Sequence, residues 1–547
     1  METTVFVNGR IFTPSNGEEA DFKEAMVIAG DKISHVGCQD DEAVRQALLS
    51  GARRVDLRNK VVVPGFIDSH MHILDFALSQ RKLSLLHCKS LAEIRSSIRE
   101  YAKNNPSAPR ILCKGWIQST TDGEARAAWL DDLDARPIYI QANDMHSGWA
   151  STAAMEEIGI PSMADPPGGK IHRDADGRPT GLLSEAAHLD VANPWLNAAT
   201  PLSQKLQALE DAVAEYTAAG YTGMIDMAME ETQWAVLETF RQQYGDKFPF
   251  HIAAHWIIPY SKDQSVVQGH LQKAIEMNEK YHPSKSPKFC IVGIKLICDG
   301  VVDGCTAALF QPYTGAKDPV DPIWPENELG RVARMADEAG LQCAIHAIGD
   351  KAVHQAVNVL SGLTPGRRHR IEHLELTSPE DAKRLGQLGI TVSVQPVHSD
   401  PALFKGWPSL VGPHRCNRAF AYREFLEGGA PMALGSDAPT AAHLALPNLY
   451  NATTRRSAIE PESTETVNEQ FKLSLAAAVT AATRGAAYSR HADSWTGSLV
   501  PGHQADFVLL DMEWDPYKLL QAKVHQTWSG GAKVFDVEQN KNISMME

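Results

Sequence analysis

The stretch Gln342-Cys343-Ala344-Ile345-His346-Ala347-Ile348 decides the fold class, because it is an apolar run of strand length that leads into the helical stretch 350–360. A strand that is apolar on both faces has to be covered on both sides, as in a parallel sheet between helices. Further runs of this kind lie at 288–297, 370–374, 390–395 and 431–436. For a chain of this length, we expect the parallel sheet to close into a distorted (β/α)8 TIM barrel rather than to stay open.

Composition and charge exclude several classes of protein. Of the 547 residues, 43% are apolar and 22% are charged, which rules out a fibrous or wholly disordered chain. The net charge of −15 would repel phosphate groups, so we expect no nucleic acid and no membrane as a partner. The eight cysteines form no C-x-x-C pair, and no signal peptide or apolar run of ~18 residues is evident. We therefore expect a cytoplasmic protein with reduced thiols.

Short β-strands at both ends of the chain predict one small domain built from the two termini. Strands are expected at 4–7, 25–29 and 32–36, with tight turns between them, and another strand is expected at 505–511. We therefore expect residues 1–60 and 490–547 to form a β-sandwich domain, and residues 61–489 to form the barrel.

Polar side chains stand at the ends of several predicted barrel strands. The stretch 61–69 runs into His70-Met71-His72, whose histidines can face one metal because alternate strand residues point the same way. Taken singly, residues of these types also occur as core histidines, as buried ion-pair or Schiff-base lysines, and as helix-capping aspartates. Active sites of α/β barrels lie where the strands end, so we expect these side chains to meet in one site. The other members of the set are Lys295, His346, His373 and Asp437.

The spacing of these residues fits strand–helix units of ~30 residues. It places Lys295, His346, His373 and Asp437 on strands four, five, six and eight. His72 lies far before Lys295, where three units would need only about 90 residues, so an insertion is predicted after strand one. Strand two is then expected at 220–227 and strand three at 250–255, and the insertion at about 74–217 is expected to roof the active site.

Five motifs together resemble the amidohydrolase superfamily, and the branch that looks nearest is amidohydrolase family 3, which includes N-substituted formamide deformylases. The resemblance covers nearly the whole chain. It implies a distorted barrel that holds one or two divalent metals, usually zinc. The motifs are Pro64-Gly65-Phe66-Ile67-Asp68-Ser69-His70-Met71-His72, Gly293-Ile294-Lys295-Leu296, His346-Ala347-Ile348-Gly349-Asp350, Ile371-Glu372-His373 and Leu434-Gly435-Ser436-Asp437-Ala438-Pro439.

The resemblance also implies how the metals are held. His70, His72 and Asp437 would bind the first metal, and His346 and His373 would bind the second. Neutral imidazole and carboxylate oxygen are ligands that suit zinc, and iron, manganese or nickel remain possible metals.

Lys295 and Asp437 are the residues to which the resemblance gives catalytic roles. A carbamate on Lys295 would bridge the two metals, and burial favours the neutral amine that carbamylation needs, because burial lowers the pKa of a lysine. The metals would activate water as hydroxide, and Asp437 would pass its proton to the leaving nitrogen. A site with one metal remains open, with Glu185 as the competing carboxylate. The implied activity is hydrolysis of a C–N bond in an amide, an N-substituted formamide or a cyclic amide.

Three residues are candidates for binding the substrate. Trp116 and His146 lie in the predicted insertion at positions that resemble family positions near the substrate, although Trp116 could equally be core packing. Asp303 lies in a glycine-rich loop after strand four, where relatives often carry a small residue. His398 and His414 follow strand seven, and we expect both to be solvated, as loop histidines usually are.

Two other classes of function remain open at this stage. The first is a non-catalytic scaffold that keeps the barrel without its metal chemistry. The second is a metal-free lyase in which Lys295 forms a Schiff base. For the hydrolase, the expected partner is a small-molecule amide, and the sequence is compatible with a homodimer.

Overall fold

The computed structural model describes residues 2–15, 19–143, 145–166, 168–245 and 248–539. The chain divides into two compact units, of which the larger comprises Met1–Ile73 with Val213–Glu547 and the smaller comprises Leu74–Ala212. Residues 1, 16–18 and 540–547 of the predicted terminal domain lie outside the described residues.

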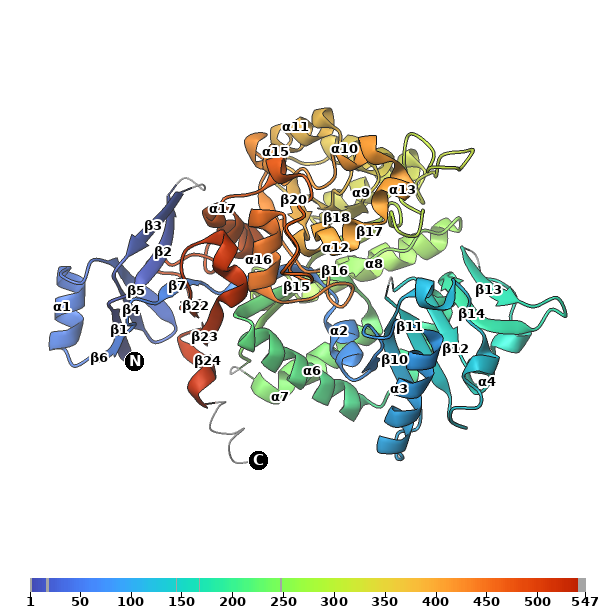
Figure 1. Ribbon diagram of the computed structural model, residues 1–547. Coiled ribbons are helices and arrows are strands. Elements are labelled where there is room, and N and C mark those ends of the chain that lie inside the picture. Colours follow the sequence, from blue (N-terminus) through green and yellow to red (C-terminus); the bar gives the residue numbers. More distant parts are fainter. Residues whose placement is uncertain (1, 16–18, 144, 167, 246–247, 540–547) are drawn as a thin grey trace. The chain divides into compact units, whose positions relative to one another are not determined.

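An eight-stranded sheet forms the centre of the larger unit (Figure 1), in the order β21-β20-β19-β18-β17-β16-β15-β8. All neighbouring strands are parallel. The two outermost strands of this order meet just past their ends, where Asp437 N donates to His70 O at 2.7 Å and His72 N donates to Ala438 O at 2.9 Å. The sheet is therefore a nearly closed barrel, and the predicted fold class is confirmed. Its strands are β8 (Phe66–Met71), β15 (Tyr221–Met229), β16 (His251–Ile257), β17 (Phe289–Ile297), β18 (Gln342–Ala347), β19 (Arg370–His373), β20 (Thr391–Val394) and β21 (Met432–Leu434).

Helices that follow the strands pack on the outside of the barrel (Figure 1). In α10, the residues Ala352, Val353, Ala356, Val357 and Leu360 are buried, which is the spacing of one helix face turned to a sheet. These helices are α7 (Glu231–Tyr244), α8 (Gln264–Lys280), α9 (Glu326–Glu338), α10 (Asp350–Ser361) and α11 (Pro379–Gln387). The chain also forms the helices α2 (Ile73–Gln80), α6 (Leu202–Ala218), α12 (Pro401–Phe404), α13 (Trp407–Val411), α14 (Pro413–Cys416), α15 (Tyr422–Glu427), α16 (Ala445–Thr454), α17 (Leu475–Thr480) and α18 (Ala486–Tyr488).

The predicted first barrel strand is two strands in the structure, separated at Gly65. Strand β7 (Val61–Pro64) pairs with β22 (Phe507–Asp511) outside the barrel, whereas β8 enters it. A Cβ atom on Gly65 would lie 2.3 Å from Thr222 Oγ1, so only glycine fits where the chain passes between the two sheets. The apolar run is continuous in sequence but serves two different sheets.

Two further sheets of the larger unit bring the chain ends together, with the orders β5-β4-β1-β6 and β24-β23-β22-β7-β2-β3. Phe6, Ile28, Phe507 and Trp528 belong to one buried cluster, so residues from both ends share a core. The remaining elements are β1 (Thr3–Val7), β2 (Arg10–Ser15), β3 (Glu19–Lys23), β4 (Ala25–Ala29), β5 (Lys32–Gly37), α1 (Glu42–Leu49), β6 (Arg53–Asp56), β23 (Lys523–Ser529) and β24 (Ala532–Asp536).

The smaller unit has its own sheet and its own core, and it lies between β8 and β15 in the chain. Its sheet has the order β13-β14-β12-β11-β10-β9, and its core contains Ile98, Trp116, Ile140 and Trp149. That this unit roofs the active site stays a prediction. Its elements are β9 (Leu83–Ser84), α3 (Leu91–Asn104), β10 (Ile111–Trp116), β11 (Ile138–Ala142), β12 (Ser147–Ala150), α4 (Thr152–Ile158), β13 (Gly169–Arg173), β14 (Pro179–Glu185) and α5 (Asn193–Ala199).

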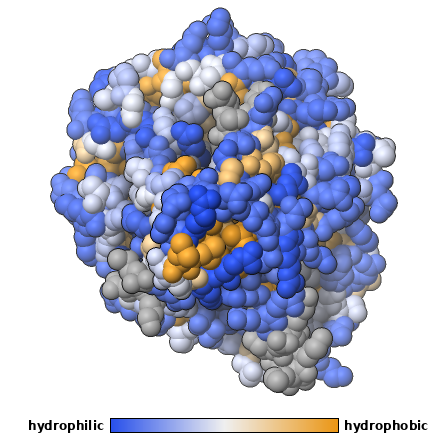
Figure 2. Space-filling view, turned by 90° about the vertical axis from the view of Figure 1, so that its left-hand side faces the viewer, coloured by the Kyte–Doolittle hydropathy of each residue, from blue (hydrophilic) through white to orange (hydrophobic). Residues whose placement is uncertain are grey.

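The surface carries few hydrophobic side chains on the face that Figure 2 shows, where they form only small patches among hydrophilic residues. Among the described residues, no helix combines the length and the apolar character that a membrane span requires.

Candidate active site

The six residues singled out at strand ends come from five strands of the barrel. His70 lies in β8, and His72 directly follows that strand. Lys295 lies in β17, His346 lies in β18, and His373 is the last residue of β19. Asp437 lies three positions after the end of β21. Because neighbouring strands are parallel, these positions meet at one edge of the barrel.

His70 is held by a buried glutamate. Its Nδ1 lies 2.7 Å from Glu372 Oε2, and both side chains are almost fully buried. Arg370 donates to both carboxylate oxygens of Glu372, at 2.6 and 3.0 Å, and holds the pKa of this carboxyl well below its usual value against the effect of burial. An ionised carboxylate only accepts hydrogen bonds, so His70 donates through Nδ1 and keeps the lone pair of Nε2 for the site.

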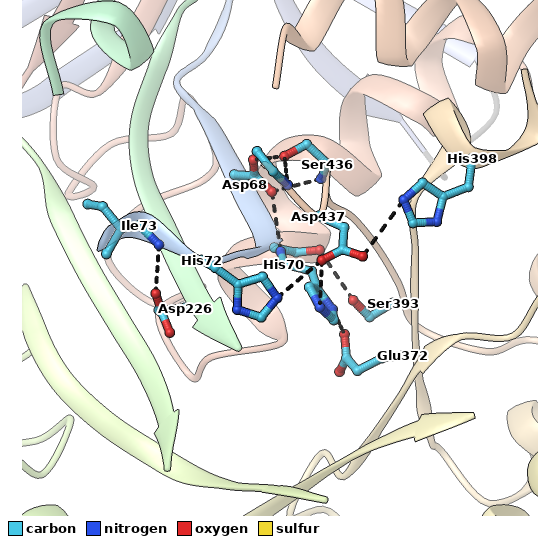
Figure 3. Close-up of polar contacts among 12 residues, drawn as sticks. Asp68, His70, His72, Ile73, Asp226, Glu372, Ser393, His398, Ser436 and Asp437 are labelled. Atoms are coloured by element: carbon cyan, nitrogen blue, oxygen red, sulfur yellow. Dashed lines mark hydrogen bonds and ion pairs between the residues drawn. The ribbon is translucent and has the colours of Figure 1, made fainter. Parts of the chain in front are cut away.

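Asp437 faces His70 and His72 through one carboxylate oxygen (Figure 3). Its Oδ1 lies 3.4 Å from His70 Nε2 and 3.3 Å from His72 Nε2. Burial would raise the pKa of Asp437, but the two histidines hold it well below its usual value. The backbone of Asp437 has a φ of 59°, a conformation that non-glycine residues adopt rarely and that often marks functional sites.

A buried aspartate and a glycine fix the segment before Asp437 onto β8. Asp68 accepts from Ser436 N at 2.9 Å and from Ser436 Oγ at 2.6 Å. A Cβ atom on Gly435 would lie 2.6 Å from His70 N, so only glycine lets the two strand ends approach this closely. These contacts therefore fix the position of Asp437 relative to His70.

Lys295 is a buried amine within this cluster. Lys295 is only 2% exposed. Burial lowers the pKa of its amine to about 8, although the nearby carboxylates of Glu372 and Asp437 favour the charged form. This is the environment that the sequence predicts for a lysine with an available neutral amine. Carbamylation of Lys295 stays a prediction.

His346 and His373 lie side by side, with ring centroids 4.3 Å apart, and the rings of His70 and His373 are 4.8 Å apart. His346 Nε2 lies 3.2 Å from Gly300 O, which leaves its Nδ1 as the possible metal donor. His373 Nδ1 is buried without a hydrogen-bond partner in the described part of the chain. Mainly through burial, the pKa of His346 falls to about 3 and that of His373 falls well below its ordinary value, so both rings are neutral.

The donors available at this edge fit a divalent cation. His70, His373 and Asp437 each offer one atom, and these atoms lie within 4.8 Å of one another. A neutral imidazole with a free lone pair and an ionised carboxylate are the donor types that such cations take. The buried, unpartnered Nδ1 of His373 is accounted for by such a ligand. Within the described residues, a second group of three donors consists of His373, Glu375 and His398.

Glu375 and His398 are the residues that sequence reasoning missed. The expectation that His398 is solvated is wrong, because its side chain is only 16% exposed and its Nδ1 lies 3.1 Å from Glu375 Oε1. Its Nε2 lies 3.7 Å from Asp437 Oδ2. The one signal for Glu375 was its place two residues after His373. His414, the other histidine after strand seven, is exposed as expected.

The three candidates for substrate binding lie in different surroundings. Trp116 is 1% exposed in the core of the smaller unit, and its Nε1 donates to Thr121 Oγ1 at 3.2 Å, which is a packing position. His146 is half-buried in the same unit, with Nδ1 2.8 Å from Oε2 of Glu185, the carboxylate weighed against Lys295. Asp303 is exposed on the loop after β17. Their contact with a substrate stays a prediction.

Comparisons with known proteins agree with this geometry. The sequence model of the amidohydrolase family matches residues 53–535. The chain is 29% identical over 546 residues to the protein LONG AFTER FAR-RED 3 of Arabidopsis thaliana, covering 96% of this chain and 91% of the relative. It is 25% identical over 518 residues to N-substituted formamide deformylase of Arthrobacter pascens, covering 90% of each. A solved structure of an uncharacterised metal-dependent hydrolase from Pyrococcus horikoshii has the same fold, with a TM-score of 0.76, 23% identity, and coverage of 94% of this chain and 98% of that chain.

Proposed function

The chain belongs to the amidohydrolase family and is a hydrolase, and from that premise we propose that it uses a divalent metal to cleave a C–N bond in a small amide. The observation that carries the proposal is the group of His70, His373 and Asp437, whose donor atoms lie within 4.8 Å of one another at the barrel edge. His70 lies in β8 and Asp437 follows β21, the two strands on either side of the barrel closure, so the site depends on the closed barrel.

The roles proposed for the residues follow from their surroundings. A bound divalent cation would supply a Lewis acid that lowers the pKa of water and polarises the scissile carbonyl. His70, His72, His346 and His373 would hold it through neutral imidazoles. Asp437, which stays ionised, would accept the proton of the attacking water and deliver it to the leaving nitrogen.

Zinc and a carbamylated Lys295 are the finer parts of the proposal. Zinc suits a site of imidazole nitrogen and carboxylate oxygen. The pKa of Lys295, lowered to about 8 by burial, leaves a fraction of neutral amine to react with carbon dioxide. A carbamate there would carry negative charge between two cations, which offsets the cost of burying it.

The proposed substrates are N-substituted formamides, N-acyl amino acids and cyclic amides. The relative named N-substituted formamide deformylase, which matches over 90% of both chains, supports the first of these classes. The neutral imidazoles of the site favour metal hydrolysis over a metal-free lyase, because a Schiff base on Lys295 would leave the buried nitrogen of His373 without a role.

The test is an activity screen of the zinc-loaded protein against N-benzylformamide, N-acetyl-L-methionine and hydantoin. We expect hydrolysis of at least one, and we expect a chelator to abolish it and added zinc to restore it. Activity that survives removal of the metal, together with covalent trapping of the substrate by borohydride, would contradict the proposal and favour the lyase. Less than half a metal ion per chain and no activity would favour the scaffold.

A further inference from the structure

Among the described residues, three arginine side chains are buried, and they differ in what surrounds the guanidinium group. Arg370 has a charged partner, because its Nε donates to the carboxylate of Glu372 at 2.6 Å. Arg490 has a neutral partner, because its Nη1 donates to His251 Nδ1 at 2.6 Å. Arg455 is 0% exposed, and neither kind of partner lies at its two Nη atoms in the described part of the chain. Of the three, Arg455 therefore has the least compensated charge.

Arg455 directly follows α16, and both of its terminal nitrogens are unsatisfied. Its Nε donates to Val467 O at 2.7 Å, whereas Nη1 and Nη2 are buried and have no hydrogen-bond partner within the described residues. Burial lowers the pKa of Arg455, and the group that opposes this effect is the hydroxyl of Tyr422 rather than a carboxylate. A guanidinium group stays protonated in proteins. Arg455 is thus a buried cation to which the described residues supply no counter-ion.

Two aromatic rings and an amide lie around this cation. The guanidinium carbon of Arg455 lies 4.9 Å from the ring centroid of Tyr422 and 5.9 Å from that of Phe420. The hydroxyl of Tyr422 donates to Gln395 O at 3.3 Å. Both polar side-chain atoms of Gln395, Oε1 and Nε2, are buried without a partner in the part of the chain that the structure describes. Two side chains with unsatisfied polar atoms therefore adjoin the same buried tyrosine.

The charge and the donors of this region favour an anion as the missing partner. Burying an unpaired charge is much more costly than burying an unpaired dipole, so a charge in a protein interior is normally paired. Water can accept hydrogen bonds from the two Nη atoms, but it has no net charge to offset that of the guanidinium group. An anion accepts these hydrogen bonds and offsets the charge as well. The surrounding side chains are at most 2% exposed, which favours a compact anion over an organic one. They are Gln395, Phe420, Tyr422 and Arg455.

We propose that Arg455 and Gln395 form a buried binding site for a halide ion, with chloride as the ligand in solution. The ion would accept hydrogen bonds from Nη1 and Nη2 of Arg455 and from Nε2 of Gln395. Gln395 directly follows β20, so the ion would link the end of a barrel strand to the end of α16. The inference does not rest on the proposed hydrolysis, in which neither residue has a role.

The first test locates the ion with bromide, whose anomalous X-ray scattering distinguishes it from water. Crystals of the full-length wild-type protein are soaked in sodium bromide. We expect an anomalous peak within hydrogen-bond distance of Nη1 or Nη2 of Arg455. Water beside Arg455, with bromide only on the surface or at the metal site of the barrel edge, would overturn the inference.

The second test measures thermal unfolding while sodium chloride replaces sodium gluconate at constant ionic strength. A ligand that binds only the folded state raises the unfolding temperature as its concentration exceeds the dissociation constant. We expect chloride to raise the unfolding temperature of the wild type by about 2 °C or more, and that of Arg455→Met not at all. Methionine keeps an unbranched side chain but removes the charge. Arg456→Met changes the neighbouring, half-buried arginine and is the matched control, which should respond as the wild type does.

A charge-retaining variant separates anion binding from a purely structural role of the arginine. Arg455→Lys should still respond to chloride, with a midpoint at an about tenfold higher concentration, because lysine lacks the second Nη donor. An equal chloride response in the wild type and in Arg455→Met would contradict the inference, as would no response in the wild type. If Arg455→Met does not fold, the bromide peak in wild-type crystals decides. None of these readouts requires turnover, so a failure of the proposed hydrolysis leaves this test intact.

Discussion

Two glutamate–histidine pairs flank Asp437, and they share a geometry. In the first, His70 Nδ1 lies 2.7 Å from Glu372 and Nε2 lies 3.4 Å from Asp437 Oδ1. In the second, His398 Nδ1 lies 3.1 Å from Glu375 and Nε2 lies 3.7 Å from Asp437 Oδ2. Each carboxylate oxygen of Asp437 thus faces an imidazole whose other nitrogen is held by a glutamate.

The first pair lies among cations. Arg370 binds both oxygens of Glu372 and holds the pKa of that carboxyl well below its ordinary value. Burial and the nearby Lys295 lower the pKa of His70 to about 4, so its ring is neutral at physiological pH. A neutral ring with its lone pair directed at the site is what a metal ligand requires.

The second pair lies among anions. Burial raises the pKa of Glu375, and Asp303 and Asp437 raise it further. The same carboxylates stabilise the protonated form of His398. The comparison teaches that neighbouring charges, rather than the glutamate–histidine contact itself, shift the pKa values of the two histidines in opposite directions. Substitutions at five positions test this distinction.

The largest effect is expected from His373→Ala. His373 belongs to both groups of possible metal donors, so its loss removes a ligand that no alternative arrangement of the site replaces. We expect bound zinc to fall below half an ion per chain and activity to fall about 1000-fold or more, since the Lewis acid contributes several kcal/mol. Metal analysis and kcat/KM measure both. His282→Ala, at an exposed position, should keep both; full zinc content in His373→Ala would contradict the assigned site.

Lys295→Ala is expected to have the next largest effect. If a carbamate on Lys295 bridges the metals, the alanine variant should be inactive and a short carboxylic acid such as acetate should restore part of the activity. The acid would place a carboxylate in the space that the lysine leaves. Lys288→Ala, at an exposed position just before the same strand, is the control and should respond to acetate as the wild type does. Failure of acetate and propionate to rescue would count against the carbamate.

Substitution of the two glutamates tests directly whether the two glutamate–histidine pairs differ in function. Glu372→Gln removes the charge that pairs with Arg370, a residue with no exposed surface, so we expect a lower unfolding temperature. It also weakens the fixing of His70, which should cost about 10–100-fold in metal affinity. Glu375→Gln should keep the metal affinity and lower kcat instead. Thermal unfolding, zinc dissociation constants and kcat separate the two. Equal loss of metal in both variants would mean that both glutamate–histidine pairs contribute to metal binding.

Much of the barrel could be predicted from the sequence because its strands are apolar on both faces. The expected strand at 342–348 is β18 in the structure, and the expected helix at 350–360 is α10. Strand one was predicted as one continuous run, because nothing in an apolar run shows which residues pair with which sheet. The break at Gly65 depends on Thr222, a residue that only the fold brings close.

The sequence predicts the positions of the histidines proposed as metal ligands but not the position of His398, for a physical reason. His70 and His373 lie in or at the end of strands, where position alone fixes the direction of a side chain. His398 lies after β20 in a short 3-10 helix, Pro396–Ser399, whose orientation depends on tertiary contacts. Its Nδ1 contacts Glu375, which follows another strand. Trp116 is the opposite case. Its place in the sequence was compatible with a substrate pocket, whereas the structure places its side chain in the core of the smaller unit.

The smallest effect is expected from Asp303→Asn, which weakens the negative charge around His398 without touching the glutamate that holds it. Asp303 is exposed, and exposed charges act weakly through water, so we expect a change of about two- to fivefold in kcat/KM for an amide substrate. Asp318→Asn removes an exposed charge further along the same connection and should leave kcat/KM unchanged. If the two variants behave alike, Asp303 does not contribute to the charge that separates His398 from His70. A loss of 100-fold or more would instead mean that Asp303 contacts the substrate itself, because screening through water could not account for so large an effect.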